Sequence, residues 1–277
     1  MTTRFCFLAL SLLLMLHGCA QPPVASLPQL SKTDAAWVGE RIFANECNLK
    51  IPCLTSWNAG EDFPSLGIGH FIWYRENQRE AFVESFPLLL NYYEQRAVEL
   101  PAWISALPNR DSPWQRREDF QAEQDSERMQ ELRSFLNDTR HIQVEFIIRR
   151  MQASLPTLVA AAAHPAEVER LFHEIAASAS PLGMYALIDY INFKGAGTSP
   201  SERYRGEGWG LLQVLEHMLA NPSEAPLMNR FAESARHILA RRIENAPPDR
   251  GEERWRVGWN NRIATYESPV GAGLARD

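Results

Sequence analysis

Residues 45–73, NECNLKIPCLTSWNAGEDFPSLGIGHFIW, decide the fold of this chain. Upstream of them, Val38, Ile42 and Phe43 recur at helical spacing, which predicts a helix that ends near Glu46. Downstream, apolar residues alternate with glycines, which is typical of a short strand or hairpin packed closely against another backbone. The stretch therefore predicts a carboxylate at the end of a helix, then a turn-rich loop, then a small hairpin.

This stretch resembles the N-terminal motif of the phage-type lysozymes. In that family a helix ends in the catalytic Glu, and Thr-Ile-Gly-Ile-Gly-His closes a small β-hairpin. Here Glu46 matches the Glu, Ser65 matches the Thr, and residues 67–70 read Gly-Ile-Gly-His. Two weaker matches lie downstream: residues 186–195 are similar to the family's central buried helix, and residues 259–263 to its closing helix.

The resemblance implies a mainly α (α+β) fold, a lysozyme-like helical domain over residues 33–268 with a small β-hairpin next to the catalytic Glu. Helical patterns in the rest of the chain agree with this class. They predict one polar helix over 114–136 and two separate helices over 141–153 and 155–164. The glycine-rich stretch 194–210 is predicted to be a loop, and no strand is expected outside the hairpin.

The resemblance also implies the chemistry of the site. Hydrolysis of a glycosidic bond needs an acid for the departing oxygen and a second group that activates water or stabilises the developing positive charge. Glu46 is predicted to be the general acid, and Ser65 is predicted to position the water. The second carboxylate is predicted to be Asp62, with Glu61 or no acidic partner as alternatives. These alternatives stay open because the family's spacing leads to Ala59, which is not an acid.

Other residues are predicted to bind substrate or to hold the site together. Three aromatic side chains are candidates for stacking on sugar rings: Trp57, Tyr204 and Trp209. His70 is predicted to tie the hairpin to the domain. Arg262 resembles the arginines of the family's closing helix, which pair with acids in the core, with a plain surface position as the alternative. No metal and no cofactor is implied.

The N-terminus predicts export and lipid attachment. Arg4 precedes an apolar run over residues 5–16, which is too short to span a bilayer and suits a signal-peptide core. The run leads into Leu-His-Gly-Cys, which resembles the processing box of bacterial lipoproteins. The prediction is a signal peptide over residues 1–18, acylation of Cys19 and a proline-rich tether over 19–32. Plain secretion is the alternative.

The remaining cysteines fit an oxidising compartment. Cys47 and Cys53 lie six residues apart and are predicted to form a disulfide, with two free thiols as the alternative. Ala20, after the acylated cysteine, favours the outer membrane over the inner one, so the domain is expected to face the periplasm of the cell envelope. Residues 269–277 are predicted to be a disordered tail.

The composition of the chain limits the classes of molecule that it is expected to bind. The chain has 277 residues and a net charge of −6, which argues against a nucleic-acid partner. The expected function is that of a lipid-anchored, lysozyme-like glycosidase, a muramidase that cleaves the glycan strands of peptidoglycan in the cell wall. A lytic transglycosylase, which needs only one Glu, and a non-catalytic glycan-binding lipoprotein are the alternatives. The oligomeric state is left open.

Overall fold

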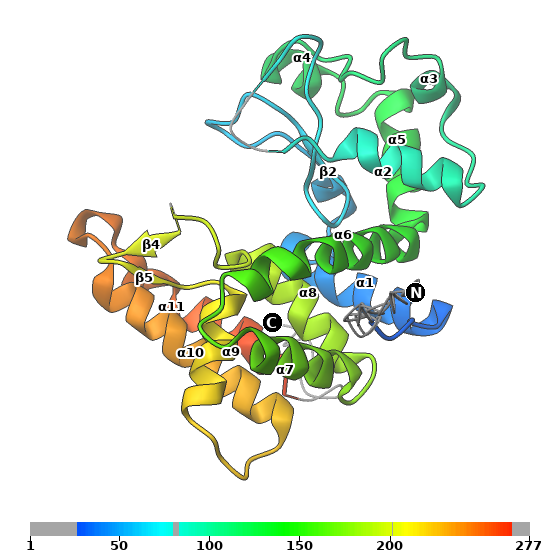
Figure 1. The fold of residues 1–277 in the computed structure, drawn as a ribbon. Coiled ribbons are helices and arrows are strands. Elements are labelled where there is room, and N and C mark those ends of the chain that lie inside the picture. Colours follow the sequence, from blue (N-terminus) through cyan, green and yellow to red (C-terminus); the bar gives the residue numbers. More distant parts are fainter. Residues whose placement is uncertain (1–26, 80–82, 201, 268–277) are drawn as a thin grey trace, which may run out of the picture.

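The computed structural model describes residues 27–79, 83–200 and 202–267, and Figure 1 shows a chain built mainly from helices. The α-helices are α1 (Lys32–Cys47), α2 (Phe86–Gln95), α3 (Ala102–Ser105), α4 (Arg117–Ala122), α5 (Glu127–Asp138), α6 (Arg140–Ala160), α7 (Pro165–Ala177), α8 (Leu182–Lys194), α9 (Leu211–Ala220), α10 (Leu227–Asn245) and α11 (Arg256–Ala264). Short 3-10 helices are η1 (Ile51–Leu54), η2 (Pro248–Arg250) and η3 (Glu252–Trp255). The strands are β1 (Thr55–Ser56), β2 (Ser65–Leu66), β3 (Phe71–Ile72), β4 (Arg203–Tyr204) and β5 (Glu207–Gly208). The predicted class, mainly helical with a small antiparallel sheet, is confirmed.

Strands β1, β2 and β3 form one antiparallel sheet with β2 in the centre. In this sheet Leu66 pairs with Thr55 on one side and with Phe71 on the other. The chain turns after Leu66 through Gly67, whose φ of +68° is a conformation that glycine adopts without steric cost. The sheet is therefore short and tightly turned.

The predicted loop after residue 194 contains a second antiparallel sheet, β4–β5, so the expectation that no strand lies outside the first hairpin is wrong. Tyr204 pairs with Glu207 across a turn formed by Arg205 and Gly206, with φ of +50° and +83°. Positive φ at both central residues is typical of the two-residue turn that matches the twist of paired strands. The sequence signal was weak, because only one of the two turn residues is a glycine.

The polar stretch 114–136 was predicted as one helix, and the structure divides it into α4 and α5. The division has a local cause. The hydroxyl of Ser126 accepts a hydrogen bond of 3.2 Å from the backbone N–H of Met129, which caps α5 and starts a new helix at that point.

The two helices predicted over 141–153 and 155–164 are instead a single helix, α6, that continues through Pro156. An internal proline removes one helical hydrogen bond. Leu155 and Leu158 on either side of it are buried, so packing against the core keeps the helix continuous. Helix α6 contacts α1, α2, α5, α7 and α8.

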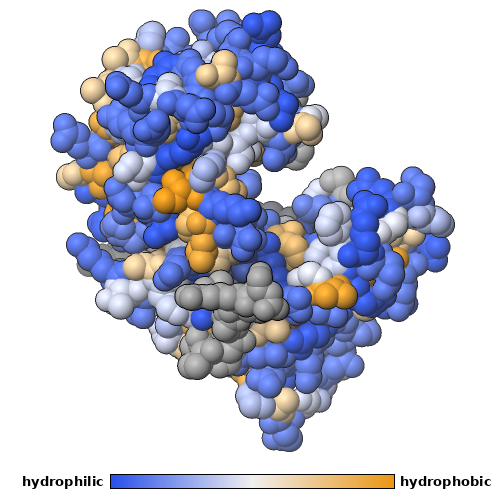
Figure 2. All heavy atoms as spheres, turned by 180° about the vertical axis from the view of Figure 1, so that it is seen from behind, coloured by the Kyte–Doolittle hydropathy of each residue, from blue (hydrophilic) through white to orange (hydrophobic). Residues whose placement is uncertain are grey.

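The described residues form two parts. In Figure 1 the first sheet and α2 to α5 lie in the upper part, α7 to α11 lie in the lower part, and α1 and α6 lie between them. One cluster of buried hydrophobic side chains runs through both parts. Figure 2 shows that the molecular surface is deeply hollowed between the two parts.

The ends of the domain differ from the prediction in one respect. Leu27 is buried, so the last residues of the predicted tether pack against the domain. The predicted signal peptide over 1–18, Cys19 and the tail over 269–277 lie outside the described residues. Among the residues that the structure describes, no helix combines the length and the apolar character that crossing a bilayer requires.

Candidate active site around Glu46

Helix α1 places Glu46 at the edge of the core. The helix begins after Ser31, whose hydroxyl accepts a hydrogen bond of 3.1 Å from the backbone N–H of Asp34. It ends where Asn48 adopts a left-handed conformation with φ of +47°. Glu46 therefore lies in the last turn, and its side chain is 22% exposed.

The carboxylate of Glu46 forms an ion pair with Arg262 of α11, 216 residues further along the chain. Arg262 also donates from Nε and Nη2 to the two carboxylate oxygens of Asp189 on α8, both at 2.8 Å. The side chain of Arg262 is 13% exposed, and that of Asp189 is fully buried. One guanidinium group thus joins a buried carboxylate to a partly exposed one.

Asp189 accepts hydrogen bonds from two further donors. The hydroxyl of Tyr266 donates to it at 2.5 Å, and the amide of Asn45 donates at 3.1 Å. Burial raises the pKa of Tyr266, and the charge of Asp189 raises it further, so this hydroxyl keeps its proton. Sequence reasoning named neither Tyr266 nor Asn45, and the match over 186–195 included Asp189 without assigning it a role.

The charges of this cluster favour a permanently charged arginine. Burial by itself lowers the pKa of Arg262, but Asp189 and Glu46 outweigh burial and raise it above its ordinary value. The ring of Phe193 covers the guanidinium group at 4.2 Å. The cluster of Glu46, Asp189 and Arg262 thus brings two carboxylate groups to one guanidinium group.

A groove of about 270 Å³ lies between the first sheet, α6 and α8; Glu46, Asp189 and Arg262 are not among the residues that line it. Its lining is mainly apolar and consists of Gly69, Phe71, Ile147, Arg150, Met151, Ser154, Ile188, Ile191, Asn192 and Ala196. Asn192 follows Asp189 by three residues, so the two lie on neighbouring turns of α8, about 4.5 Å apart along the helix axis. On the other wall, Gly69 belongs to the segment that the sequence matched to Gly-Ile-Gly-His.

A buried glutamine of α6 holds that segment in place. The side-chain oxygen of Gln143 accepts a hydrogen bond of 2.9 Å from the backbone N–H of Ile68, and its amide donates to the carbonyl of Leu136 at 2.7 Å. A Cβ atom at Gly67 would lie 2.4 Å from the same side-chain oxygen, so the close approach requires a glycine there. Sequence reasoning missed Gln143, because a single glutamine inside an apolar helix gives no indication of its partner.

The three residues predicted around the second catalytic group differ in their surroundings. Ser65 lies in β2 and is 5% exposed. Asp62 is exposed, and its backbone carbonyl accepts from Gln78 at 3.0 Å. The carboxylate of Glu61 accepts a hydrogen bond from the amide of Asn58 at 3.1 Å.

The aromatic residues predicted to bind sugar pack against other protein groups. Trp57 is 7% exposed, and its ring packs edge-on against Phe120. Trp209 is 8% exposed and lies between Tyr204 and the guanidinium of Arg242, at 4.6 Å and 4.1 Å. Protein groups therefore pack against both indoles.

Cys47 and Cys53 form the predicted disulfide just after Glu46. A ring nitrogen of His70 lies within 4.8 Å of both sulfur atoms, and among the described residues its buried Nε2 has no hydrogen-bond partner. This is the spacing of metal ligands, but the two sulfurs are bonded to each other, so neither is a free thiolate. His70 therefore packs the hairpin against the disulfide.

Comparisons of the chain with protein-family models, with curated proteins and with solved structures found no match. The functional assignment therefore depends on the residues and geometry described above.

Proposed function

We propose that this chain is a lysozyme-like hydrolase that cleaves the glycan strands of peptidoglycan, with Glu46 as the general acid. The observation that carries the proposal is the partly exposed carboxylate of Glu46, which a buried arginine–aspartate pair holds at the end of α1. A mainly apolar groove between the first sheet, α6 and α8 supplies the concave surface of the proposal. A glycosidase needs a fixed acid beside a concave site that excludes most water.

Of the two carboxylates in the cluster, only that of Glu46 is open to solvent. Asp189 is fully buried and is held by Arg262, Tyr266 and Asn45, so it cannot exchange a proton with a substrate. Glu46 is the accessible member of the pair. In the proposed reaction its protonated carboxyl donates the proton to the departing glycosidic oxygen, and the carboxylate that remains is stabilised by Arg262.

The groove has the features of a sugar subsite. Its volume of about 270 Å³ is near the lower end of small-molecule sites, roughly 300 Å³, which suits one sugar ring rather than a long segment. The apolar side chains can cover the face of a pyranose, and the amide of Asn192 can hydrogen-bond to an N-acetyl group. In the proposal, a long glycan strand lies in the hollow between the two parts of the molecule (Figure 2).

The second group in the proposal is a water positioned by Ser65, with Asp62 as the second carboxylate. Asp62 is preferred to Glu61 because the carboxylate of Glu61 is engaged with Asn58. Within the described part of the chain, the carboxylate of Asp62 has no hydrogen-bond partner, and it is exposed. It is therefore free to act on solvent or substrate.

A specific observation also favours the transglycosylase alternative. The Glu46–Arg262–Asp189 cluster contains only one carboxylate with solvent access. A transglycosylase needs only one, because the 6-hydroxyl of the sugar attacks in place of water. The products distinguish the two reactions, since hydrolysis leaves a reducing end and transglycosylation leaves a 1,6-anhydro end.

The deciding experiment uses purified protein and isolated peptidoglycan. Glu46→Gln keeps the size of the side chain but removes the acid, and we expect activity to fall by about 10²–10⁴-fold. The matched control is Glu40→Gln, which removes an exposed acid from the same helix and should keep wild-type activity. Mass spectrometry of the released fragments identifies the chain ends.

The outcomes test the assignment of the acid and distinguish an enzyme from a non-catalytic binding protein. If Glu46→Gln is as active as the wild type, the assignment of the acid is wrong. If neither protein releases fragments but both bind peptidoglycan, the chain is the non-catalytic glycan-binding protein.

We also propose that the mature chain is a lipoprotein anchored at Cys19 in the outer membrane and facing the periplasm. The Cys47–Cys53 disulfide supports an oxidising compartment. Cys19→Ser should move the protein from the membrane fraction to the soluble fraction and remove the acyl mass from the intact protein. Retention of Cys19→Ser in the membrane fraction would refute the anchor.

A further inference from the structure

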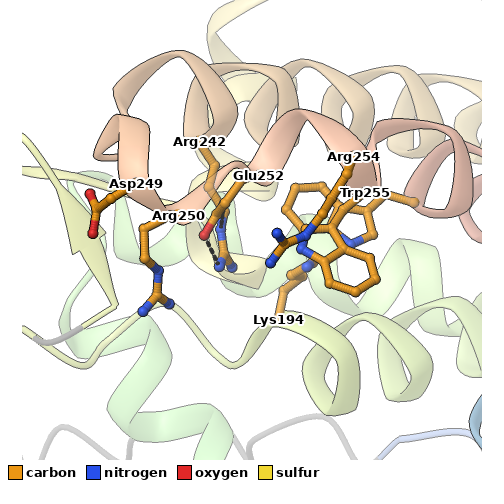
Figure 3. Close-up of a pocket in the computed structure, with 8 residues that line it drawn as sticks. Lys194, Arg242, Asp249, Arg250, Glu252, Arg254 and Trp255 are labelled. Atoms are coloured by element: carbon orange, nitrogen blue, oxygen red, sulfur yellow. Dashed lines mark hydrogen bonds and ion pairs between the residues drawn. The ribbon is translucent and has the colours of Figure 1, made fainter.

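A second pocket, of about 590 Å³, lies between the C-terminal end of α8, α10 and the segment η2–η3 (Figure 3). Its lining is rich in cations: Lys194, Arg242, Arg250 and Arg254. No pattern in the sequence groups these residues, and none of them has a role in the reaction proposed above. Such a concentration of positive charge is unexpected in a chain whose net charge is −6.

Of these four cations, only Arg242 is paired with an acid of the pocket. Glu252 is fully engaged, because it forms a two-point ion pair with Arg242 at 2.8 and 2.9 Å and accepts a hydrogen bond from Tyr204 at 2.9 Å. Figure 3 shows Asp249 directed away from the ammonium group of Lys194. Within the described residues, Lys194, Arg250 and Arg254 form no ion pair, so the pocket carries uncompensated positive charge.

Lys194 is the buried member of this group. It is 8% exposed, and its Nζ lies 3.5 Å from the ring centre of Trp259 and 3.9 Å from that of Phe193. These aromatic faces stabilise an ammonium group but do not supply a counter-charge. Among the described residues, the amino group of Lys194 thus lines the pocket without an ion-pair partner.

The pocket also offers an aromatic surface to solvent. The ring of Trp255 is half exposed, which is unusual for a large apolar side chain, and the guanidinium of Arg254 lies 5.1 Å from its centre. Exposed indoles bind the flat apolar faces of sugar rings. Guanidinium groups bind carboxylates and phosphates through paired hydrogen bonds.

We propose that this pocket is a binding site for an anionic saccharide, whose carboxylate or phosphate contacts Lys194 and Arg254 and whose ring packs on Trp255. A volume of about 590 Å³ lies well inside the range of small-molecule sites and exceeds what a bare inorganic anion needs. This inference goes beyond the proposed function, because no step at Glu46 depends on it.

Because Lys194 lines the pocket, binding of an anion should depend on pH, which would not be the case at a surface patch of arginines. Burial lowers the pKa of Lys194 to about 6, Arg242 and Arg262 lower it as well, and Glu252 acts in the opposite direction. The other charges that line the pocket are Asp249, Arg250 and Arg254. Lys194 is therefore largely neutral at pH 7.5, and an arriving anion favours its protonated form. Binding should therefore be accompanied by proton uptake at that pH and should weaken as the pH rises from 6 to 8.

The test is isothermal titration calorimetry on the full chain, in buffers that differ in ionisation enthalpy. The probes are N-acetylmuramic acid for the carboxylate, N-acetylglucosamine 6-phosphate for the phosphate, neutral N-acetylglucosamine, and inorganic phosphate. We expect at least one acidic sugar to bind more tightly, by about tenfold or more, than either the neutral sugar or inorganic phosphate. Its binding should also be accompanied by proton uptake. The tighter of the two acidic sugars identifies the anionic group.

Two variants locate the site. Lys194→Met should weaken the acidic sugar by about tenfold or more and abolish proton uptake, whereas Lys50→Met, at an exposed lysine outside the pocket, should change neither. Trp255→Ala should weaken the acidic sugar without reducing the binding of inorganic phosphate. Thermal melting shows that each variant is folded.

Equal binding of the neutral and acidic sugars would overturn the proposal, and so would unchanged binding by Lys194→Met. Because the readouts are binding and proton uptake, an inactive Glu46 would leave this test unaffected. Conversely, failure here leaves the Glu46 assignment intact.

Discussion

Arg262 and Asp189, 73 residues apart in the chain, form a two-point ion pair with both hydrogen bonds at 2.8 Å, and Asp189 has no solvent exposure. The same guanidinium group reaches Glu46. This pair joins α8 to α11 and fixes the carboxylate at the end of α1. Stability and the candidate chemistry therefore depend on one arginine.

Removing that arginine should be costly. Arg262→Met leaves the buried carboxylate of Asp189 without its counter-charge, and we expect the free energy of unfolding to fall by about 3–5 kcal/mol in urea titrations. Arg256→Met is the control on the same helix, because its partner Glu253 is 68% exposed and the pair should contribute less than about 1 kcal/mol. Equal decreases in the free energy of unfolding in the two variants would show that the buried pair stabilises the fold no more than the exposed pair does.

Gln143 should stabilise both the fold and the groove. Gln143→Met leaves the N–H of Ile68 and the carbonyl of Leu136 buried without partners, which should cost about 2–3 kcal/mol of unfolding free energy. Amide exchange at Ile68 should become faster, and cleavage of peptidoglycan should decrease because Gly69 lines the groove. Gln152→Met, at an exposed position of the same helix, is the control and should have little effect on any of the three measurements.

The disulfide should contribute modestly. Cys47 and Cys53 are six residues apart, and closing so short a loop should stabilise the fold by about 2 kcal/mol, mainly by restraining the unfolded chain. Reduction of the wild type should therefore lower the melting temperature. The double variant Cys47→Ala/Cys53→Ala should melt near the reduced protein and should not respond to reductant; a response would point to another thiol-dependent effect.

Lys194 should make stability depend on pH in a defined direction. The pKa of Lys194 is about 6 in the folded state, against about 10.4 in an unfolded chain. Between these values the unfolded chain binds one more proton than the folded one, so this residue makes the free energy of unfolding rise with pH by up to about 1.4 kcal/mol per pH unit. Lys194→Met removes this dependence, so its stability advantage over the wild type should be largest near pH 6 and should shrink toward pH 10.

Denaturant titrations of both proteins across that range measure the difference. The control is again Lys50→Met, since an exposed lysine should not change the pH dependence relative to the wild type. A stability difference between Lys194→Met and the wild type that does not vary with pH would mean that Lys194 titrates normally in the folded protein.

Much of the fold could be read from local patterns. The end of α1 near Glu46 followed from helical spacing, and the pairing of Cys47 with Cys53 followed from their separation. Of the two errors in helix boundaries, one had a local cause and the other a tertiary cause. A serine cap divided the predicted polar helix, and buried leucines carried α6 through Pro156.

By itself, the sequence determined the helical class, the end of the first helix and the short cysteine-bridged loop, because each depends on residues within a few positions of one another. Only the tertiary structure decided that Arg262 faces both Glu46 and Asp189, that Gln143 holds the turn at Ile68, and that Lys194 lies buried among cations. Those relationships join segments 48 to 216 residues apart. No periodicity or motif encodes such pairings, since they arise from how the helices pack around a shared core.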